Sequence, residues 1–187
     1  MPATNSPTPS GAKAGRKNPV PTTSANPAAP RDRNAAAPEH PKVSKRRVNR
    51  IVAMQMLYAW GCSPCAPEKT AEFVFDFLEQ QPRPREFYAF AEELFAGTIQ
   101  NLARIDGIIS DCAKNWSLAR IARCDLAILR LAIYEMLYRN DIPPIVSINE
   151  AIDLAKQFST EDSHRFVNGV LDRIKAQLSR PLRDAQR

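Results

Sequence analysis

The segment 117–139, SLARIARCDLAILRLAIYEMLYR, limits what this chain can fold into more than any other, because its apolar residues cover most of a helix circumference. A helix with so little polar surface has to be covered by other elements on several sides. Those elements are predicted to be helices as well, since no alternation of apolar and polar residues runs long enough for a strand. We therefore expect an all-α fold of six or seven helices with this segment at its centre.

The other helices are indicated by apolar residues at spacings of three and four and by cap and breaker residues. Ser147 and Glu150 form an S-x-x-E capping box, which predicts that one helix begins near Ile148. Ser159 or Thr160 is the candidate cap of the following helix. The expected helices cover residues 44–60, 68–80, 84–114 with Gly107 as a candidate break, 148–158 and 161–174.

Three glycines, Gly97, Gly107 and Gly169, fall inside helical patterns. A glycine inside a helix costs about 1 kcal/mol relative to alanine. Close contact between two helices would offset that cost, so we expect helix contacts at these positions.

Positive charge is concentrated at the N-terminal end. The chain has 187 residues and a net charge of +6, but residues 1–50 hold ten Lys and Arg against two acids, while the remainder holds sixteen against eighteen. This asymmetry indicates a polyanionic partner that is met at one end of the protein. We expect residues 1–43, which are rich in Pro and Ala, to be a disordered tail, 44–180 to form one domain, and 181–187 to be a flexible end.

The chain carries no sequence signal for secretion or for a membrane span. Its tail lacks the apolar core of a signal peptide, and no stretch approaches the ~18 apolar residues of a spanning helix. A transit peptide is an alternative for the tail, although its prolines disfavour the amphipathic helix that such a peptide needs. We expect a cytoplasmic protein whose four cysteines, Cys62, Cys65, Cys112 and Cys124, are free thiols.

A basic run, Lys45, Arg46 and Arg47, followed by Arg50, opens the first predicted helix. Cations at a helix N-terminus oppose the helix dipole and repel each other, so helix stability does not explain them. Phosphate binding does, because guanidinium groups and free backbone N–H groups then face the same anion. Arg46, Asn49 and Arg50 are predicted to share one exposed face, although such a run is also compatible with a merely solvated surface.

The segment STEDSHRF, residues 159–166, collects hydroxyls, carboxylates, an imidazole, a guanidinium and an aromatic ring at a helix start. Cap residues plus one core aromatic would account for it structurally. Alternatively, an exposed Phe166 would stack on an unpaired RNA base, for about 1–3 kcal/mol.

Metal, redox and catalytic roles find little support. Cys62 and Cys65 have C-x-x-C spacing, but no second such pair or nearby histidine pair completes a zinc site. His164 lies beside carboxylates without another ligand at a suitable spacing. We expect no cofactor, no metal site and no enzymatic activity.

Four long segments carry a resemblance to a known family. They are RRVNRIVAMQMLYAW (46–60), FAGTIQNLARIDGII (95–109), NWSLARIARCDLAILRLAIYEM (115–136) and VSINEAIDLAKQFSTEDSHRFVNGVLD (146–172). Together and in this order they resemble the NusB family of transcription antitermination factors. The resemblance covers nearly all of residues 44–175 and implies a fold of two packed three-helix subdomains plus an additional helix.

The resemblance also implies partners and sites. Members pair with NusE, a small-subunit ribosomal protein, and together bind single-stranded boxA RNA, so that RNA polymerase reads through terminators in ribosomal RNA operons. On that basis the helix around residue 125 is expected to contact NusE, with an exposed Asp125 as the candidate residue. The implied RNA-binding residues are Lys45, Arg46, Arg47, Arg50, Asp162, Ser163, Arg165 and Phe166.

Two other functions stay open on the sequence. One is a NusB-like RNA-binding module associated with ribosomal RNA modification, because such domains also occur in certain ribosomal RNA methyltransferases. The other is a helical adaptor without RNA contacts, for which the arginines at the start of the first helix would be dispensable.

Overall fold

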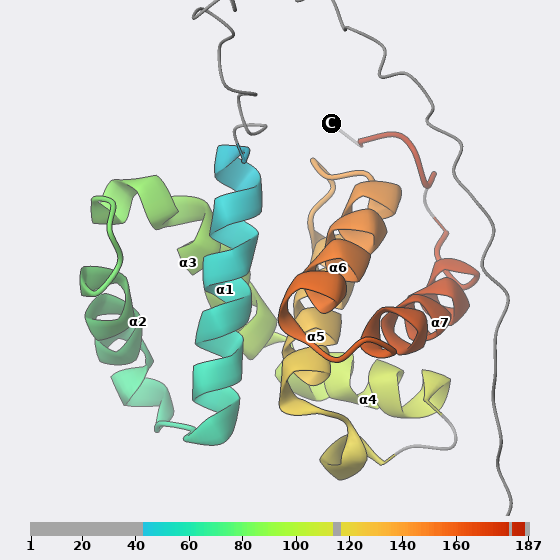
Figure 1. The fold of residues 1–187 in the computed structure, drawn as a ribbon, viewed down its shortest axis with the longest axis horizontal. Helices are drawn as coiled ribbons and strands as arrows, with labels where there is room; N and C mark the ends of the chain where they lie inside the picture. Colours follow the sequence, from blue (N-terminus) through green and yellow to red (C-terminus); the bar gives the residue numbers. More distant parts are fainter. Residues whose placement is uncertain (1–42, 114–116, 180, 186–187) are drawn as a thin grey trace, which may run out of the picture. The chain divides into compact units, whose positions relative to one another are not determined.

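The computed structural model describes residues 43–113, 117–179 and 181–185, and every regular element within these ranges is a helix (Figure 1). The predicted tail lies almost entirely outside them. Three short 3-10 helices, Pro67–Lys69, Arg85–Tyr88 and Leu118–Arg120, precede longer ones. The α-helices of these ranges are α1 (Lys45–Cys62), α2 (Thr70–Glu79), α3 (Ala89–Gln100), α4 (Leu102–Cys112), α5 (Arg123–Tyr138), α6 (Pro144–Phe158) and α7 (Ser163–Lys175).

Helix α5 is the central element, as its apolar circumference predicts. It packs against α1 and α3 on one side and against α4, α6 and α7 on the other (Figure 1). Helices α1 to α3 form one three-helix group, in which the Phe73 and Phe95 rings join α2 to α3. Helices α5 to α7 form the second group, to which α4 is added. The all-α prediction with two packed subdomains is confirmed.

A buried ion pair joins three of these helices. Arg50 Nε of α1 donates to Glu135 Oε1 of α5 at 2.8 Å, and Ser147 Oγ of α6 donates to Glu135 Oε2 at 2.7 Å. The side chains of Arg50 and Glu135 are 4% and 1% exposed. A charge removed from water needs this kind of pairing to be tolerated, so the three residues fix how α1, α5 and α6 meet.

The prediction of one exposed face for Arg46, Asn49 and Arg50 is therefore wrong for two of its members. Asn49 is fully buried: its amide group donates to the Phe87 carbonyl at 3.1 Å, and its oxygen accepts from the Ala91 backbone N–H at 2.9 Å. Helix α1 is covered on two sides, by α3 and by α5, so a face without apolar residues is also buried.

Three predicted helix boundaries are also wrong. Helix α5 begins at Arg123 instead of near Ser117, because Leu118–Arg120 forms a separate 3-10 helix. Helix α6 begins at Pro144 instead of near Ile148, because proline suits the first helical position and Ser147 binds Glu135 instead of capping. The long helical segment divides at Asn101 instead of at Gly107. There the Asn101 side chain donates to the Gly97 carbonyl at 2.8 Å and helps to end α3.

Of the three helical glycines, only Gly97 marks a close helix contact. A Cβ atom added there would overlap the Tyr134 ring of α5, whereas one added at Gly107 or at Gly169 would meet no atom within 4 Å. Helix contact thus accounts for Gly97 alone among the three.

Replacing Gly97 by alanine should consequently change the stability of the protein in the opposite direction from replacing Gly107 or Gly169. Gly97→Ala is expected to lower the free energy of unfolding by about 1–3 kcal/mol, because the Tyr134 ring must move. Gly107→Ala and Gly169→Ala are expected to raise it by about 0.5–1 kcal/mol, because alanine favours the helix at no steric cost. Urea unfolding followed by circular dichroism measures all three; a stabilising Gly97→Ala would contradict the contact.

Candidate nucleic-acid interface

The basic run at the start of α1 is divided among different environments. Ser44 caps the helix by accepting the Arg47 backbone N–H at 3.2 Å. Lys45 and Arg46 are exposed, while Arg47 is bound to α6, where its two terminal nitrogens contact Glu150 Oε2 at 3.1 Å and Gln157 Oε1 at 3.2 Å. Two of the four predicted cations are therefore exposed to solvent, whereas the guanidinium group of Arg47 already has hydrogen-bond acceptors on α6.

Arg50 does not belong to this exposed set. Its side chain is buried against Glu135, so direct contact with RNA would require breaking the ion pair that joins α1 to α5. The sequence pattern placed it with the exposed cations because a buried arginine and a solvated one look identical without the tertiary partner.

Arg46 keeps its charge available despite an acidic neighbour. Its side chain is 57% exposed and approaches Asp141 at 3.5 Å. Asp141 is held more closely by Arg139, at 3.0 Å, and this hydrogen bond lowers the pKa of the Asp141 carboxyl. Since Asp141 already has a cationic partner, Arg46 loses little by turning toward a phosphate.

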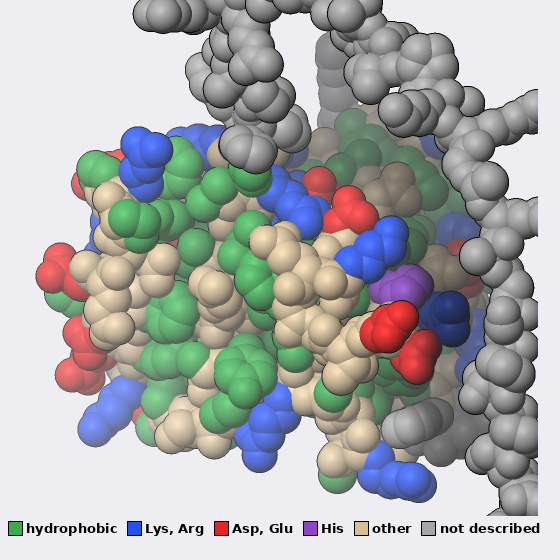
Figure 2. Space-filling model, viewed as in Figure 1, with side chains coloured by type: hydrophobic (Ala, Val, Ile, Leu, Met, Phe, Trp, Pro, Cys, Tyr) green, Lys and Arg blue, Asp and Glu red, His purple; other side chains and the backbone are tan. Residues whose placement is uncertain are grey.

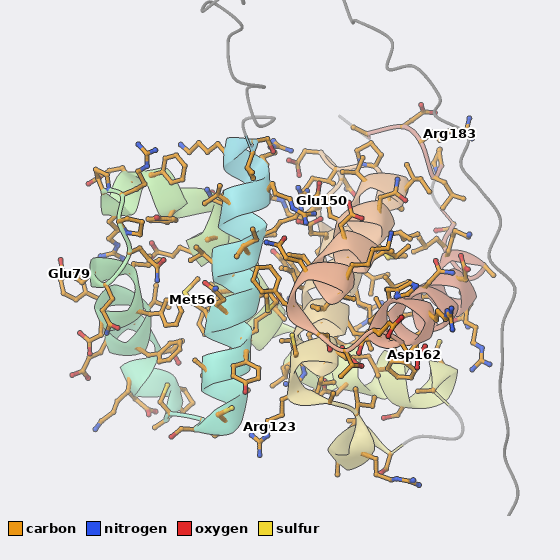
Figure 3. The ribbon with its side chains drawn as sticks, in the orientation of Figure 1. Met56, Glu79, Arg123, Glu150, Asp162 and Arg183 are labelled. Atoms are coloured by element: carbon orange, nitrogen blue, oxygen red, sulfur yellow. The ribbon has the colours of Figure 1, made fainter. Side chains whose placement is uncertain are left out.

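The second predicted cluster forms the wall of a pocket at the turn between α6 and α7. Figure 3 shows Asp162 at this turn, and its side chain is 84% exposed. Arg165 is similarly exposed and pairs with Asp162 at 3.1 Å. Phe166 is half-buried. The pocket has a volume of about 310 Å³ and is lined by Arg120, Ile121, Ala122, Asp125, Thr160, Asp162, Ser163 and Phe166.

Ser163 and Asp125 are placed differently from the prediction. Ser163 is buried and Asp125 is only 5% exposed. Asp125 accepts hydrogen bonds from Ser159 Oγ at 2.6 Å and from Ser163 Oγ at 2.9 Å. The expectation of an exposed Asp125 on α5 is wrong, because the turn between α6 and α7 covers it. The predicted cap is wrong too, since these hydroxyls bind Asp125 and each other instead of the start of α7.

The structure thus brings together Asp162, Ser163 and Phe166 around one pocket, with Arg165 at its outer edge. Lys45 and Arg46 lie elsewhere, beside the rings of Phe87 and Phe90. Arg47 lies between the two groups, because its partner Gln157 belongs to the last turn of α6.

A second, apolar surface was missed at the sequence level. It is a groove of about 440 Å³ lined by Met54, Gln55, Tyr58, Ala59, Phe77, Cys124 and Phe158. Tyr58 is 44% exposed, and Figure 2 shows hydrophobic side chains exposed over the lower half of α1. The available signal was Tyr58 itself, an aromatic residue seven positions after Ile51 and therefore on the same side of the helix.

The described residues hold no group of three or more His, Cys, Asp or Glu side chains arranged to bind a metal ion. Cys62, Cys65, Cys112 and Cys124 are all free thiols. Burial raises the pKa of the Cys124 thiol, which disfavours the reactive thiolate. None of the helices in the described ranges is long and apolar enough to cross a membrane.

Known proteins similar to this chain include several with the same fold. The transcription antitermination protein NusB of Treponema pallidum (strain Nichols) is 44% identical over 135 residues, which are 72% of this chain and 94% of that protein. A solved structure of T. maritima NusB is 34% identical, with a TM-score of 0.64, and the match covers 72% of this chain and 93% of that one.

A crystal structure of the antitermination factors NusB and NusE in complex with dsRNA contains a further similar chain. It is 25% identical, with a TM-score of 0.63, and the match covers 72% of this chain and 98% of that one. The sequence pattern that defines the NusB family matches residues 47–176. The resemblance seen in the sequence is confirmed: the chain belongs to the NusB family.

Proposed function

We propose that this protein is a transcription antitermination factor that binds boxA RNA of nascent ribosomal RNA transcripts together with NusE. Bound in this way, it helps RNA polymerase to read through terminators. The observation that carries the proposal is the pocket beside Phe166 on a NusB fold. The activity is recognition and includes no chemical step.

The pocket suits an unpaired base better than a duplex. It combines a half-buried aromatic ring with hydroxyl and carboxylate groups, and its volume is at the small end of the ~300–1,000 Å³ typical of ligand pockets. A base stacked on Phe166 would be read by Thr160, Asp162 or Arg120 at its edge. Single-stranded RNA offers such bases, whereas an A-form helix keeps its major-groove edges out of reach.

The exposed cations supply affinity that does not depend on sequence. Lys45 and Arg46 at the start of α1 and Arg165, which pairs with Asp162 of the pocket, are solvent-exposed, so their charges are accessible to phosphates. Neutralising a phosphate releases counterions, so each contact adds salt-dependent affinity. Base contacts in the pocket then supply the selectivity.

The apolar groove is the proposed contact surface for NusE. Tyr58 and Phe158 are aromatic side chains at its wall, and such residues in a concave site commonly carry most of the energy of a protein interface. The NusE role moves from Asp125, which is buried, to this groove. A similar NusB chain was crystallised with NusE, which supports the choice of partner.

The proposal is tested by fluorescence anisotropy on boxA and scrambled single-stranded RNA, with and without NusE, across a salt series. We expect a preference for boxA when NusE is present. The slope of log affinity against log salt should be about −0.7 for each phosphate contacted. Equal affinity for both RNAs in the presence of NusE, or an affinity independent of salt, would refute the proposal.

Asp162→Asn is expected to tighten RNA binding roughly two- to fivefold, because it removes an exposed negative charge beside the phosphates and releases Arg165 from its ion pair. The same titrations measure it. Asp76→Asn, at an exposed position on α2, is the matched control and should change nothing. Unchanged or weaker binding by Asp162→Asn would contradict the placement of phosphates at this turn.

Tyr58→Ala is expected to weaken NusE binding by about 1–2 kcal/mol, or roughly 5- to 30-fold. Isothermal titration calorimetry without RNA measures the change. Phe75→Ala on α2 is the control, since Phe75 is 45% exposed, close to the 44% of Tyr58, but lies outside the groove. Equal losses for both variants would argue against the groove as the NusE site.

A further inference from the structure

A buried carboxylate, that of Asp125, is among the groups that line the proposed RNA pocket. We propose that Asp125 is the positioning residue of this pocket: it binds the turn between α6 and α7 through two serine hydroxyls and thereby holds Asp162 and Phe166 in place for RNA. The RNA part of this inference rests on the function proposed above. Asp125 lines the pocket but is only 5% exposed, and both of its carboxylate oxygens accept hydrogen bonds from serines, so the role we assign to it is to hold the turn.

The donor and the acceptor of each hydrogen bond around Asp125 can be assigned. Four close oxygen contacts join Asp125, Ser159, Thr160 and Ser163: Ser159 to Asp125 at 2.6 Å, Ser163 to Asp125 at 2.9 Å, Ser159 to Ser163 at 2.9 Å, and Thr160 to Ser163 at 2.8 Å. An ionised carboxylate only accepts, so both serines donate to it. Thr160 must then donate to Ser163, and the three hydroxyl protons are all used in three of the four contacts. The 2.9 Å contact between Ser159 and Ser163 is left without a proton of its own.

The position of the carboxylate between two helix starts stabilises its charge. Asp125 lies in the first turn of α5, and Ser163 is the first residue of α7. Helix N-termini carry a partial positive charge, which favours an anion there. Asparagine has the same size but would lose this attraction, and it would keep one acceptor oxygen and place an N–H donor against the other serine hydroxyl.

The turn passes this constraint to the pocket. Ser163 follows Asp162 directly, and the Asp162 carbonyl accepts the backbone N–H groups of Arg165 at 3.1 Å and Phe166 at 3.4 Å. Fixing Ser163 therefore fixes the first turn of α7, from which Asp162 and Phe166 line the pocket.

Asp125 and the residue before it, Cys124, belong to different surfaces of the protein, the pocket and the apolar groove. Cys124 lines the apolar groove, and its thiol donates to the Phe158 carbonyl at 3.4 Å, while Asp125 binds Ser159 on the pocket side. Consecutive residues of α5 thus hold consecutive residues at the end of α6, one pair on each surface. NusE affinity measured without RNA consequently serves as the readout for the groove.

The test compares Asp125→Asn and Ser163→Ala with Asp106→Asn in the full chain. Asp106 is the matched control, because it is a partly buried carboxylate that binds Arg130 of α5 with two hydrogen bonds of 2.8 Å and lines neither surface. Three quantities are measured well below each melting temperature: boxA and scrambled RNA affinity with NusE present, NusE affinity alone, and amide hydrogen exchange of residues 159–166.

Asp125→Asn should weaken boxA binding roughly tenfold or more and reduce the preference over scrambled RNA, with faster exchange in the turn and unchanged NusE affinity. Ser163→Ala should act in the same direction, which keeps the test valid if Asp125→Asn fails to fold. Adding Asp125→Asn to Phe166→Ala should cost little further affinity, because both changes act on one contact. Asp106→Asn should alter none of these properties.

The outcomes that overturn the inference differ from those that overturn the proposed function. If the unsubstituted protein prefers boxA but Asp125→Asn and Ser163→Ala bind it equally well, Asp125 does not position the pocket. A loss of NusE affinity with RNA binding intact would make Asp125 a partner residue instead. If the unsubstituted protein shows no boxA preference, the proposed function fails and the RNA role of Asp125 with it, while hydrogen exchange still decides whether Asp125 holds the turn.

Discussion

The buried pair between Arg50 and Glu135 is the interaction on which the rest of the structure depends. It crosses the boundary between the two helix groups, and Ser147 extends it to α6. Removing either charge would leave the other buried without a partner, a situation that typically costs about 3–5 kcal/mol. The pair therefore does more than stabilise: it specifies how α1 is placed against α5 and α6, and with it where the basic start of α1 lies.

The helical content and the central place of α5 follow from the sequence because both are recorded in the periodicity of apolar residues. Polar residues are where that pattern fails. Arg50, Asn49, Asp125, Ser147 and Ser163 were all assigned to surfaces or caps, yet all are buried. Burial of a polar group requires a partner of matching chemistry, and the tertiary hydrogen-bond partners of Asn49 and Arg50 are 38 to 85 residues away. Local sequence does not contain this information.

The sequence predicts which residues belong to the candidate site better than it predicts where they lie. Asp162, Arg165 and Phe166 do lie at one turn, and Lys45 and Arg46 are exposed. The apolar groove escaped prediction because Tyr58, Phe77 and Phe158 come from three separate helices, none of which carries an unusual apolar pattern near its own groove residue. Under the proposed function, the separation of the pocket from the apolar groove would allow one small domain to bind RNA and NusE at once.

The polar residues of α5 also explain why its neighbours cannot slide. Asp125, Arg130 and Glu135 are five residues apart, and at about 100° per residue each one points about 140° away from the last. One binds the turn before α7, one binds α4, and one binds α1 and α6. An inserted or deleted residue within α5 would rotate part of this set away from its partners. Insertions and deletions in relatives should accordingly be confined to the connections on either side of α5. There an added or lost residue does not rotate these side chains away from their partners.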